Sequence, residues 1–184
     1  MKLGILPRMT LEELSRLPDD FNRYELIGGE LFATPAPRTR HQIIVSRLTD
    51  LISPFVRRKK LGLVLAAPVD VTLEPESRVQ PDLLFIARDR LDILTEEGVL
   101  GPPDLVVEIL SESSSSSDRK NKRDLYRRAG VKEYWIVDHE KDSLLVYRWA
   151  EGSDPVKLGS QDVLTTPLIP GLRIRLRAVL SKRL

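Results

Sequence analysis

The spacing of apolar residues changes along the chain, and each change predicts a different element of secondary structure. From about Thr39, apolar residues recur every three or four positions, which is the pattern of a helix with one buried face. Pro54 falls inside this pattern, so the helix is expected to kink or end there. A second helix is predicted over residues 115–129, with Gly130 as its C-cap. The predicted apolar face of the first helix consists of Ile44, Leu48, Leu51, Ile52 and Phe55.

Shorter apolar runs predict strands. Residues 63–73, 80–87 and 103–110 form three such runs, and the last is apolar almost throughout. That composition is typical of a strand whose sheet is covered on both faces. Two hairpins are predicted as well, one around the paired glycines at 28–29 and one across the HEKD segment at 139–142.

The two ends of the chain complete the pattern. Residues 10–17 predict a short helix, because Thr10 and Glu13 match a capping box. The C-terminal part is strand-like and interrupted by prolines. The order helix, hairpin, helix, strands, helix, strands predicts an α/β (α+β) fold around one mixed sheet. A chain of 184 residues suits one domain, 1–184, with a substantial hydrophobic core.

Composition narrows the classes of protein that fit. Apolar residues make up 41% of the chain and charged residues 30%, so we expect a folded domain rather than a disordered one. The absence of cysteine excludes disulfides and thiolate metal sites and fits a reducing compartment. No apolar run reaches membrane-spanning length and the first residues lack a signal-peptide stretch, so we expect a cytoplasmic protein without membrane segments. The net charge of +2 permits a nucleic-acid partner without requiring one.

Two of the predicted strands carry a carboxylate where the pattern calls for an apolar residue. Asp82 directly precedes the apolar run LLFI, and Glu108 interrupts VVEIL. An ionised carboxylate buried alone is costly, so each acid needs a cation or a metal ion as partner. If the two strands are neighbours, both acids can converge on one ion. The alternative is a pair of acids at strand edges that face water.

The helix predicted after the serine run places one lysine on its inner face. Lys122 shares a helical stripe with Leu125 and Tyr126, whereas the neighbouring cations fall mostly on the other side. Cations on an outer face are usually solvated, but a lysine on the inner face needs a partner. Either Lys122 pairs with Asp118, four residues earlier, or it reaches the acids of the neighbouring strands.

Taken together, these segments resemble a known family. "QPDLLFI", "DLVVEIL" and "D-R-x-x-K-x-x-x-Y-x-x-x-G-V-x-E-Y-W-x-V-D" resemble the Uma-two endonuclease-like family in type and order. "LPDDFNRYELIGGEL" and the "P-x-x-x-H" before the long helix are similar to its pattern as well. The resemblance extends from about Thr10 to Val146. Because this family belongs to the PD-(D/E)xK nuclease superfamily, it implies a restriction-endonuclease-like fold, a mixed β-sheet flanked by helices with extra β-hairpins.

The resemblance also implies roles for individual residues. Asp82 matches the acid of the Pro-Asp element and Glu108 the acid of the second element. With the backbone carbonyl of Ile109, they would hold Mg²⁺ or Mn²⁺, which favour hard oxygen ligands. The superfamily expects a lysine two residues after the second acid, where this chain has Leu110. Lys122 matches the helix lysine that takes over this role in the Uma-two group.

Further residues enter through the same resemblance. Glu25 matches an acidic position near the metal, and His41 matches the histidine of the "P-x-x-x-H" element. His41, Asp118 and Tyr126 are accessory candidates, although a lone histidine or tyrosine on a helix is more often a packing residue. The implied reaction is hydrolysis of DNA phosphodiester bonds. The implied catalytic set is Glu25, Asp82, Glu108 and Lys122.

Three interpretations remain open from the sequence. The first is a metal-dependent endonuclease that acts on DNA as a homodimer, since two active sites suit duplex cleavage. The second is a nucleic-acid-binding protein that keeps the fold without the activity. The third is a structural protein whose acids and lysine form a buried ion-pair network. The densest basic run, residues 57–60, is either a phosphate contact or a solvated helix end.

Overall fold

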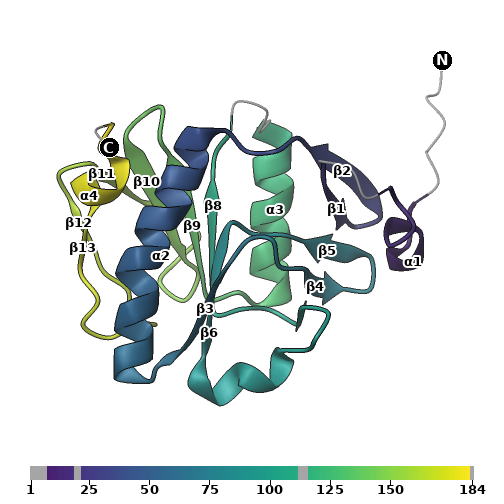
Figure 1. Ribbon diagram of the computed structural model, residues 1–184, viewed down its shortest axis with the longest axis horizontal. Helices are drawn as coiled ribbons and strands as arrows, with labels where there is room; N and C mark the ends of the chain where they lie inside the picture. Colours follow the sequence, from purple (N-terminus) through teal and green to yellow (C-terminus); the bar gives the residue numbers. More distant parts are fainter. Residues whose placement is uncertain (1–7, 19–21, 112–115, 183–184) are drawn as a thin grey trace.

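A mixed β-sheet lies at the centre of the molecule (Figure 1). The computed structural model describes residues 8–18, 22–111 and 116–182, apart from the side chains of residues 116–118. Within these residues the sheet has six strands, and only β8 and β9 among its neighbouring pairs are parallel. In spatial order they are β11 (Val156–Gly159), β10 (Ser143–Arg148), β9 (Glu133–Asp138), β8 (Leu105–Ile109), β6 (Leu83–Ala87) and β3 (Gly62–Ala66).

A second sheet, of five strands in the described part of the chain, lies beside the first (Figure 1). It joins the N-terminal hairpin to strands from the middle of the sequence. Gly28 and Gly29 both have positive φ, which suits the tight turn of that hairpin. In spatial order the strands are β2 (Glu30–Thr34), β1 (Arg23–Ile27), β5 (Ser77–Val79), β4 (Val71–Glu74) and β7 (Val99–Leu100).

Helices cover both faces of the central sheet (Figure 1). The helix α2 (Thr39–Lys59) and the short α4 (Leu176–Leu180) pack on one face. The helix α3 (Ser116–Ala129) forms the crossover from β8 to β9 and packs on the other face. β8 is buried along its whole length, as its apolar composition predicts.

The remaining elements are short. The capping box predicted at Thr10 and Glu13 is present at the start of α1 (Leu11–Leu14). Between β6 and β7 the chain forms the 3-10 segment η1 (Arg88–Ile93). Near the C-terminus β12 (Val163–Leu164) pairs with β13 (Ile174–Arg175). No helix in the described residues has both the length and the apolar character needed to cross a membrane.

The predicted fold class is confirmed. The prediction of one mixed sheet is wrong, because the described strands form two larger sheets and one pair. The apolar run at 63–73 forms two strands, β3 and β4, which belong to different sheets. Residues 75–76 form a tight connection from β4 to β5, and β5 lies between two of the predicted runs. The short helix α4 was not predicted, because five residues are too few to show a helical period.

Two details of α2 also differ from the prediction. The helix continues through Pro54 to Lys59, although proline removes one backbone hydrogen bond and usually breaks a helix. Burial of the helix along the sheet offsets that loss. Leu51 is 39% exposed, because the buried face is centred on the side of Val45 and Val56 and Leu51 lies at its margin.

Candidate active site

Asp82 and Glu108 lie opposite each other on neighbouring strands. β6 and β8 pair antiparallel with Leu83 across from Val107, and one further step of this register brings Asp82 across from Glu108. Residues directly opposite in such a pair have Cβ atoms about 5 Å apart. Asp82 is 1% exposed and Glu108 8% exposed. The strands therefore place two buried carboxylates side by side, as the sequence predicted for neighbouring strands.

Three donors hold the carboxylate of Asp82. Oδ2 accepts the backbone N–H of Ile109 at 2.8 Å and lies 3.0 Å from Nε2 of His41. Oδ1 accepts a hydrogen bond from the Arg23 guanidinium at 3.1 Å. Burial alone would raise the pKa of Asp82, but the His41 hydrogen bond and the positive charge of Arg23 hold that pKa below its usual value. Asp82 is therefore ionised at neutral pH.

Glu108 lies in a less favourable environment. Its Oε1 accepts hydrogen bonds from the Tyr126 hydroxyl at 2.7 Å and from Lys122 Nζ at 3.0 Å. Burial, opposed by Lys122 and reinforced by the charges of Asp82 and Glu25, raises its pKa to about 7. Its Oε2 receives no hydrogen bond from the residues that the structure describes.

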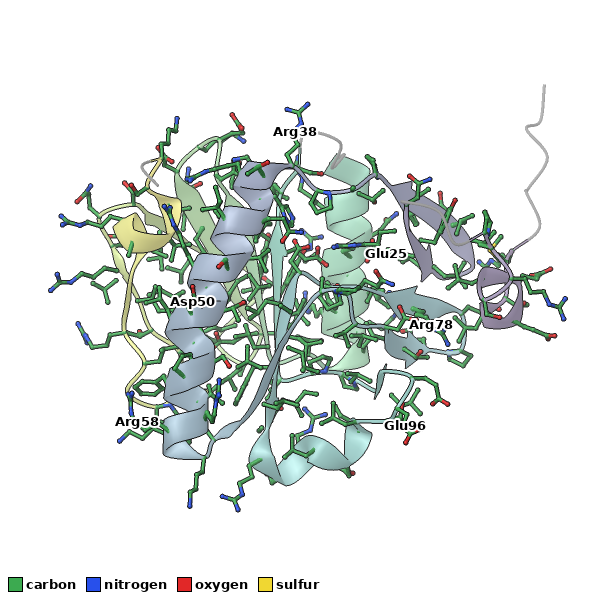
Figure 2. All side chains as sticks on the ribbon, viewed as in Figure 1. Glu25, Arg38, Asp50, Arg58, Arg78 and Glu96 are labelled. Carbon is green, nitrogen blue, oxygen red and sulfur yellow. The ribbon has the colours of Figure 1, made fainter. Side chains whose placement is uncertain are left out.

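Lys122 joins the strand acid to the N-terminal hairpin. Its Nζ lies 2.8 Å from Oε2 of Glu25, in addition to its contact with Glu108. Glu25 also accepts the backbone N–H of Gln80 at 2.8 Å, and it lies where the β1 hairpin meets α3 (Figure 2). The side chain of Lys122 is 15% exposed, and although its partial burial opposes the charged form, the two carboxylates raise its pKa above the usual lysine value. The ammonium is therefore permanently charged.

The structure brings together most of the residues proposed from the sequence. The lysine reaches Glu108, one of the two strand acids, and the side chain of Asp118 lies outside the described residues. Ile109 contributes its N–H to Asp82, and its carbonyl as a metal ligand stays a prediction. The acid cluster consists of two adjacent hydrogen-bonded groups, His41 with Asp82, and Glu25, Lys122 and Tyr126 with Glu108.

Arg23 belongs to this cluster and was missed. Besides its bond to Asp82, it donates to the backbone carbonyl of Gln80 at 3.0 Å. Arg23 and Glu25 are two residues apart on one strand, so they face the same side. This spacing could have indicated Arg23 from the sequence, but only after Glu25 had been assigned to the site.

The donor chemistry of the cluster fits a divalent cation. Three carboxylates face two permanent cations, Arg23 and Lys122, so one negative charge is not compensated when His41 is neutral. Burial is the main cause of the raised pKa of Glu108, and the charges of Asp82 and Glu25 add to it. In the described residues no three His, Asp or Glu side chains stand arranged around one metal position. A cation would therefore replace contacts that Arg23 and Lys122 make with Asp82 and Glu108.

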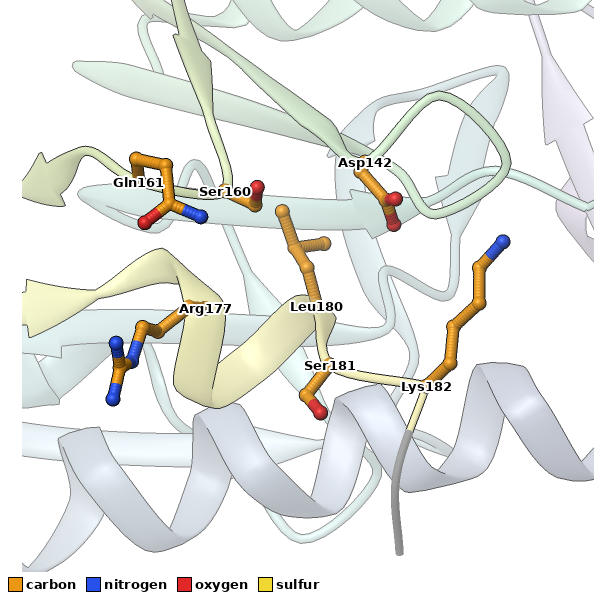
Figure 3. Close-up of a pocket in the computed structure, with 7 residues that line it drawn as sticks. All are labelled: Asp142, Ser160, Gln161, Arg177, Leu180, Ser181 and Lys182. Carbon is orange, nitrogen blue, oxygen red and sulfur yellow. The ribbon is translucent and has the colours of Figure 1, made fainter.

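A separate cavity of about 470 Å³ lies away from this chemistry (Figure 3). It is bounded by the turn before β10, the loop before β12 and α4, and Leu180 extends across it. It shares no residue with the acid cluster, and its charged residues are of both signs. Its lining consists of Asp142, Ser160, Gln161, Arg177, Leu180, Ser181 and Lys182.

Comparison with known proteins gives the class to which this fold and cluster belong. Residues 11–177 match the model of the Uma2 family, which is described as "Putative restriction endonuclease", and the chain belongs to that family. A solved structure with the same fold is "a putative nuclease belonging to DUF820" from Anabaena variabilis ATCC 29413. It is 20% identical, with a TM-score of 0.80, over 94% of this chain and 98% of that one. No curated protein matches the chain.

Proposed function

We propose that this protein is a metal-dependent nuclease that hydrolyses phosphodiester bonds of DNA at the cluster around Asp82 and Glu108. The observation that carries the proposal is the position of Lys122. The ammonium of this helix residue lies 3.0 Å from Glu108, the strand acid next to Asp82. The position where the superfamily expects lysine holds Leu110, which cannot supply a charge. The family and the nuclease named in the similar structure support the reaction class.

Asp82 and Glu108 would hold the cation, with the carbonyl of Ile109 as a further oxygen ligand. Bound Mg²⁺ or Mn²⁺ would supply Lewis acidity toward water and toward the scissile phosphate. Asp82 is prepared for this role because His41 and the Ile109 N–H fix the orientation of its carboxylate. Glu108 is prepared because one of its oxygens is held by Tyr126.

Lys122 acts through its charge and its N–H groups. Because its pKa is raised, it cannot remove a proton from water at neutral pH. An ammonium has three donors, and the contacts with Glu25 and Glu108 use two of them. The third can hydrogen-bond the attacking water or an oxygen of the phosphate, where negative charge develops in the transition state. Glu25 and Glu108 together fix the position of that donor.

The experiment is cleavage of supercoiled plasmid and of single-stranded DNA by purified protein, with Mg²⁺ or Mn²⁺ and with EDTA. We expect cleavage only with a divalent cation, and a loss on the order of a hundredfold or more in Asp82→Asn. Asp92→Asn removes an exposed acid outside the cluster and is the matched control.

Either of two results would contradict this proposal. If the parent protein binds DNA but cleaves nothing with any divalent cation, it is a binding protein that keeps the fold. If Asp82→Asn cleaves as fast as the parent, the cluster is an ion-pair network that only stabilises the fold. The preference for DNA, the homodimer, the single domain and the cytoplasmic location stay predictions.

A further inference from the structure

A groove of about 320 Å³ lies between one side of α3 and strands β9, β10 and β11. Leu110, two residues after Glu108 in the chain, is part of its lining. The groove lies on the same face of the central sheet as α3, because Ile136 belongs to the apolar core beneath that helix. Its lining consists of Leu110, Arg119, Lys120, Arg123, Ile136, Asp138, Lys141, Ser143, Leu145, Tyr147 and Lys157.

The strand register shows how the groove is joined to the acids. Glu108 is paired with Ile136 of β9, Ile136 with Leu145 of β10, and Leu145 with Lys157 of β11. These residues form one row across the sheet that begins at Glu108 and ends at Lys157. Three strand spacings separate its ends, or about 14 Å. Nucleic acid advances about 3.4 Å per nucleotide along its axis, so this row spans about four nucleotides.

Positive charge is concentrated in this groove. Five cationic side chains and one carboxylate line it, whereas the whole chain carries a net charge of only +2. Two of the cations have carboxylate partners, Arg123 with Asp124 and Lys141 with Asp138. Within the described part of the chain, the other three make no ion pair. These three are Arg119, Lys120 and Lys157.

We propose that this groove binds the sugar–phosphate backbone of the nucleic acid on one side of the scissile bond. The proposal rests on the proposed function and adds to it the path of the substrate. Unpaired cations that lead away from two metal-binding acids match the charge of successive phosphates. Tyr147 lies in the groove but is buried, so it offers no ring on which a base can stack. The groove would therefore contact the backbone rather than stacked bases.

The test measures binding in EDTA, where the proposed cleavage cannot occur. A fluorescein-labelled oligonucleotide is titrated with protein and followed by fluorescence anisotropy, with a single-stranded and a duplex arm. The groove variant is Lys120→Ala/Lys157→Ala. The matched control is Arg57→Ala/Lys59→Ala, which removes two exposed cations from the end of α2 that lies away from the start of α3 (Figure 1).

We expect the groove variant to raise Kd at least tenfold at low salt, and the control variant to change it less than twofold. The slope of log K against log salt should fall by about 1.4 on single strands or about 1.8 on duplex in the groove variant, because two phosphate contacts are lost. The arm with the larger fold-change in Kd identifies the form of nucleic acid that the groove accepts.

Equal losses in the two variants would overturn the proposal, as would a parent protein that binds neither oligonucleotide. A groove variant that binds normally but changes the sedimentation coefficient would show that this face contacts a second copy of the chain. Failure of the proposed function is a separate outcome, because a parent that cleaves nothing can still bind through the groove and lose binding in the variant.

Discussion

Lys122 Nζ lies 3.0 Å from Glu108 Oε1, although the two residues come from a helix and a strand and are 14 positions apart in the sequence. The contact closes the crossover from β8 through α3, since it ties the helix back to the strand that precedes it. It also brings Glu25 of the N-terminal hairpin into the cluster. One lysine therefore fixes three elements around the two acids of the central sheet.

The raised pKa of Glu108 makes the stability of the metal-free protein depend on pH. In the folded state this pKa is about 7, whereas an unfolded glutamate titrates near about 4.3. Folding therefore favours the protonated form, and stability falls as the pH rises from about 4.3 to about 7. We expect Glu108→Gln to be more stable than the parent by roughly 1–3 kcal/mol at pH 8, and by much less at pH 4.

Urea denaturation in EDTA at several pH values checks this expectation. Glu96→Gln, an exposed glutamate far from the cluster in Figure 2, is the control and should follow the parent at every pH. A Glu108→Gln variant that is less stable than the parent at pH 8 would show that the ionised carboxylate contributes net stability through Lys122.

Arg23 and Asp82 give a prediction for metal affinity. Asp82→Ala removes a proposed ligand and should abolish Mn²⁺ binding. Arg23→Met removes a positive charge 3.1 Å from that ligand, so it should tighten Mn²⁺ binding on the order of tenfold. Isothermal titration calorimetry measures both changes. Unchanged affinity in both variants would place the cation away from Asp82.

Asp104 provides an acid-sensitive contact outside the candidate site. It is fully buried, and it accepts hydrogen bonds from Arg90 at 2.9 Å and from the backbone N–H of Ala87 at 2.8 Å. Although burial opposes ionisation, these donors and Lys132 lower its pKa. Its stabilising contribution is therefore present above the unfolded value of about 3.9 and is lost as the pH falls through the lower folded value.

Asp104→Asn should lower the free energy of unfolding by about 2 kcal/mol at pH 7, since Arg90 and Lys132 are partly exposed and can be solvated. It should also flatten the loss of stability below pH 4. Denaturation at pH 7 and pH 3 tests both points. An unchanged stability at pH 7 would mean that solvent replaces these ion pairs without cost.

Helices and strands in which apolar residues recur at a clear spacing could be predicted from the sequence, and those too short to show such a spacing could not. The long helix, both hairpins and the apolar strand β8 follow from patterns of several residues. β7 has two residues and α4 has five, which is too short for either period to show. Assignment of strands to two sheets depends on pairings between distant segments, and no local pattern records those pairings.

Some residues of the candidate site could be predicted from the sequence, and others could not. Asp82, Glu108 and Lys122 each contradict the apolar pattern around them, and that contradiction made them visible. Arg23 lies at an ordinary polar position, so its ion pair with Asp82 is apparent only in three dimensions. The proposed replacement of the strand lysine also depends on the tertiary structure, because Lys122 lies on a helix 12 residues after Leu110.

The most direct test of the account is the single-turnover rate of DNA cleavage by Lys122→Ala at saturating Mg²⁺ and saturating enzyme. Because Lys122 is proposed to stabilise charge in the transition state, its removal should slow cleavage on the order of a hundredfold or more. Binding of DNA should change by less than about threefold, and Lys59→Ala, an exposed lysine on α2, should match the parent in both. If Lys122→Ala cleaves as fast as the parent, the lysine is structural and the proposed catalytic cluster is wrong.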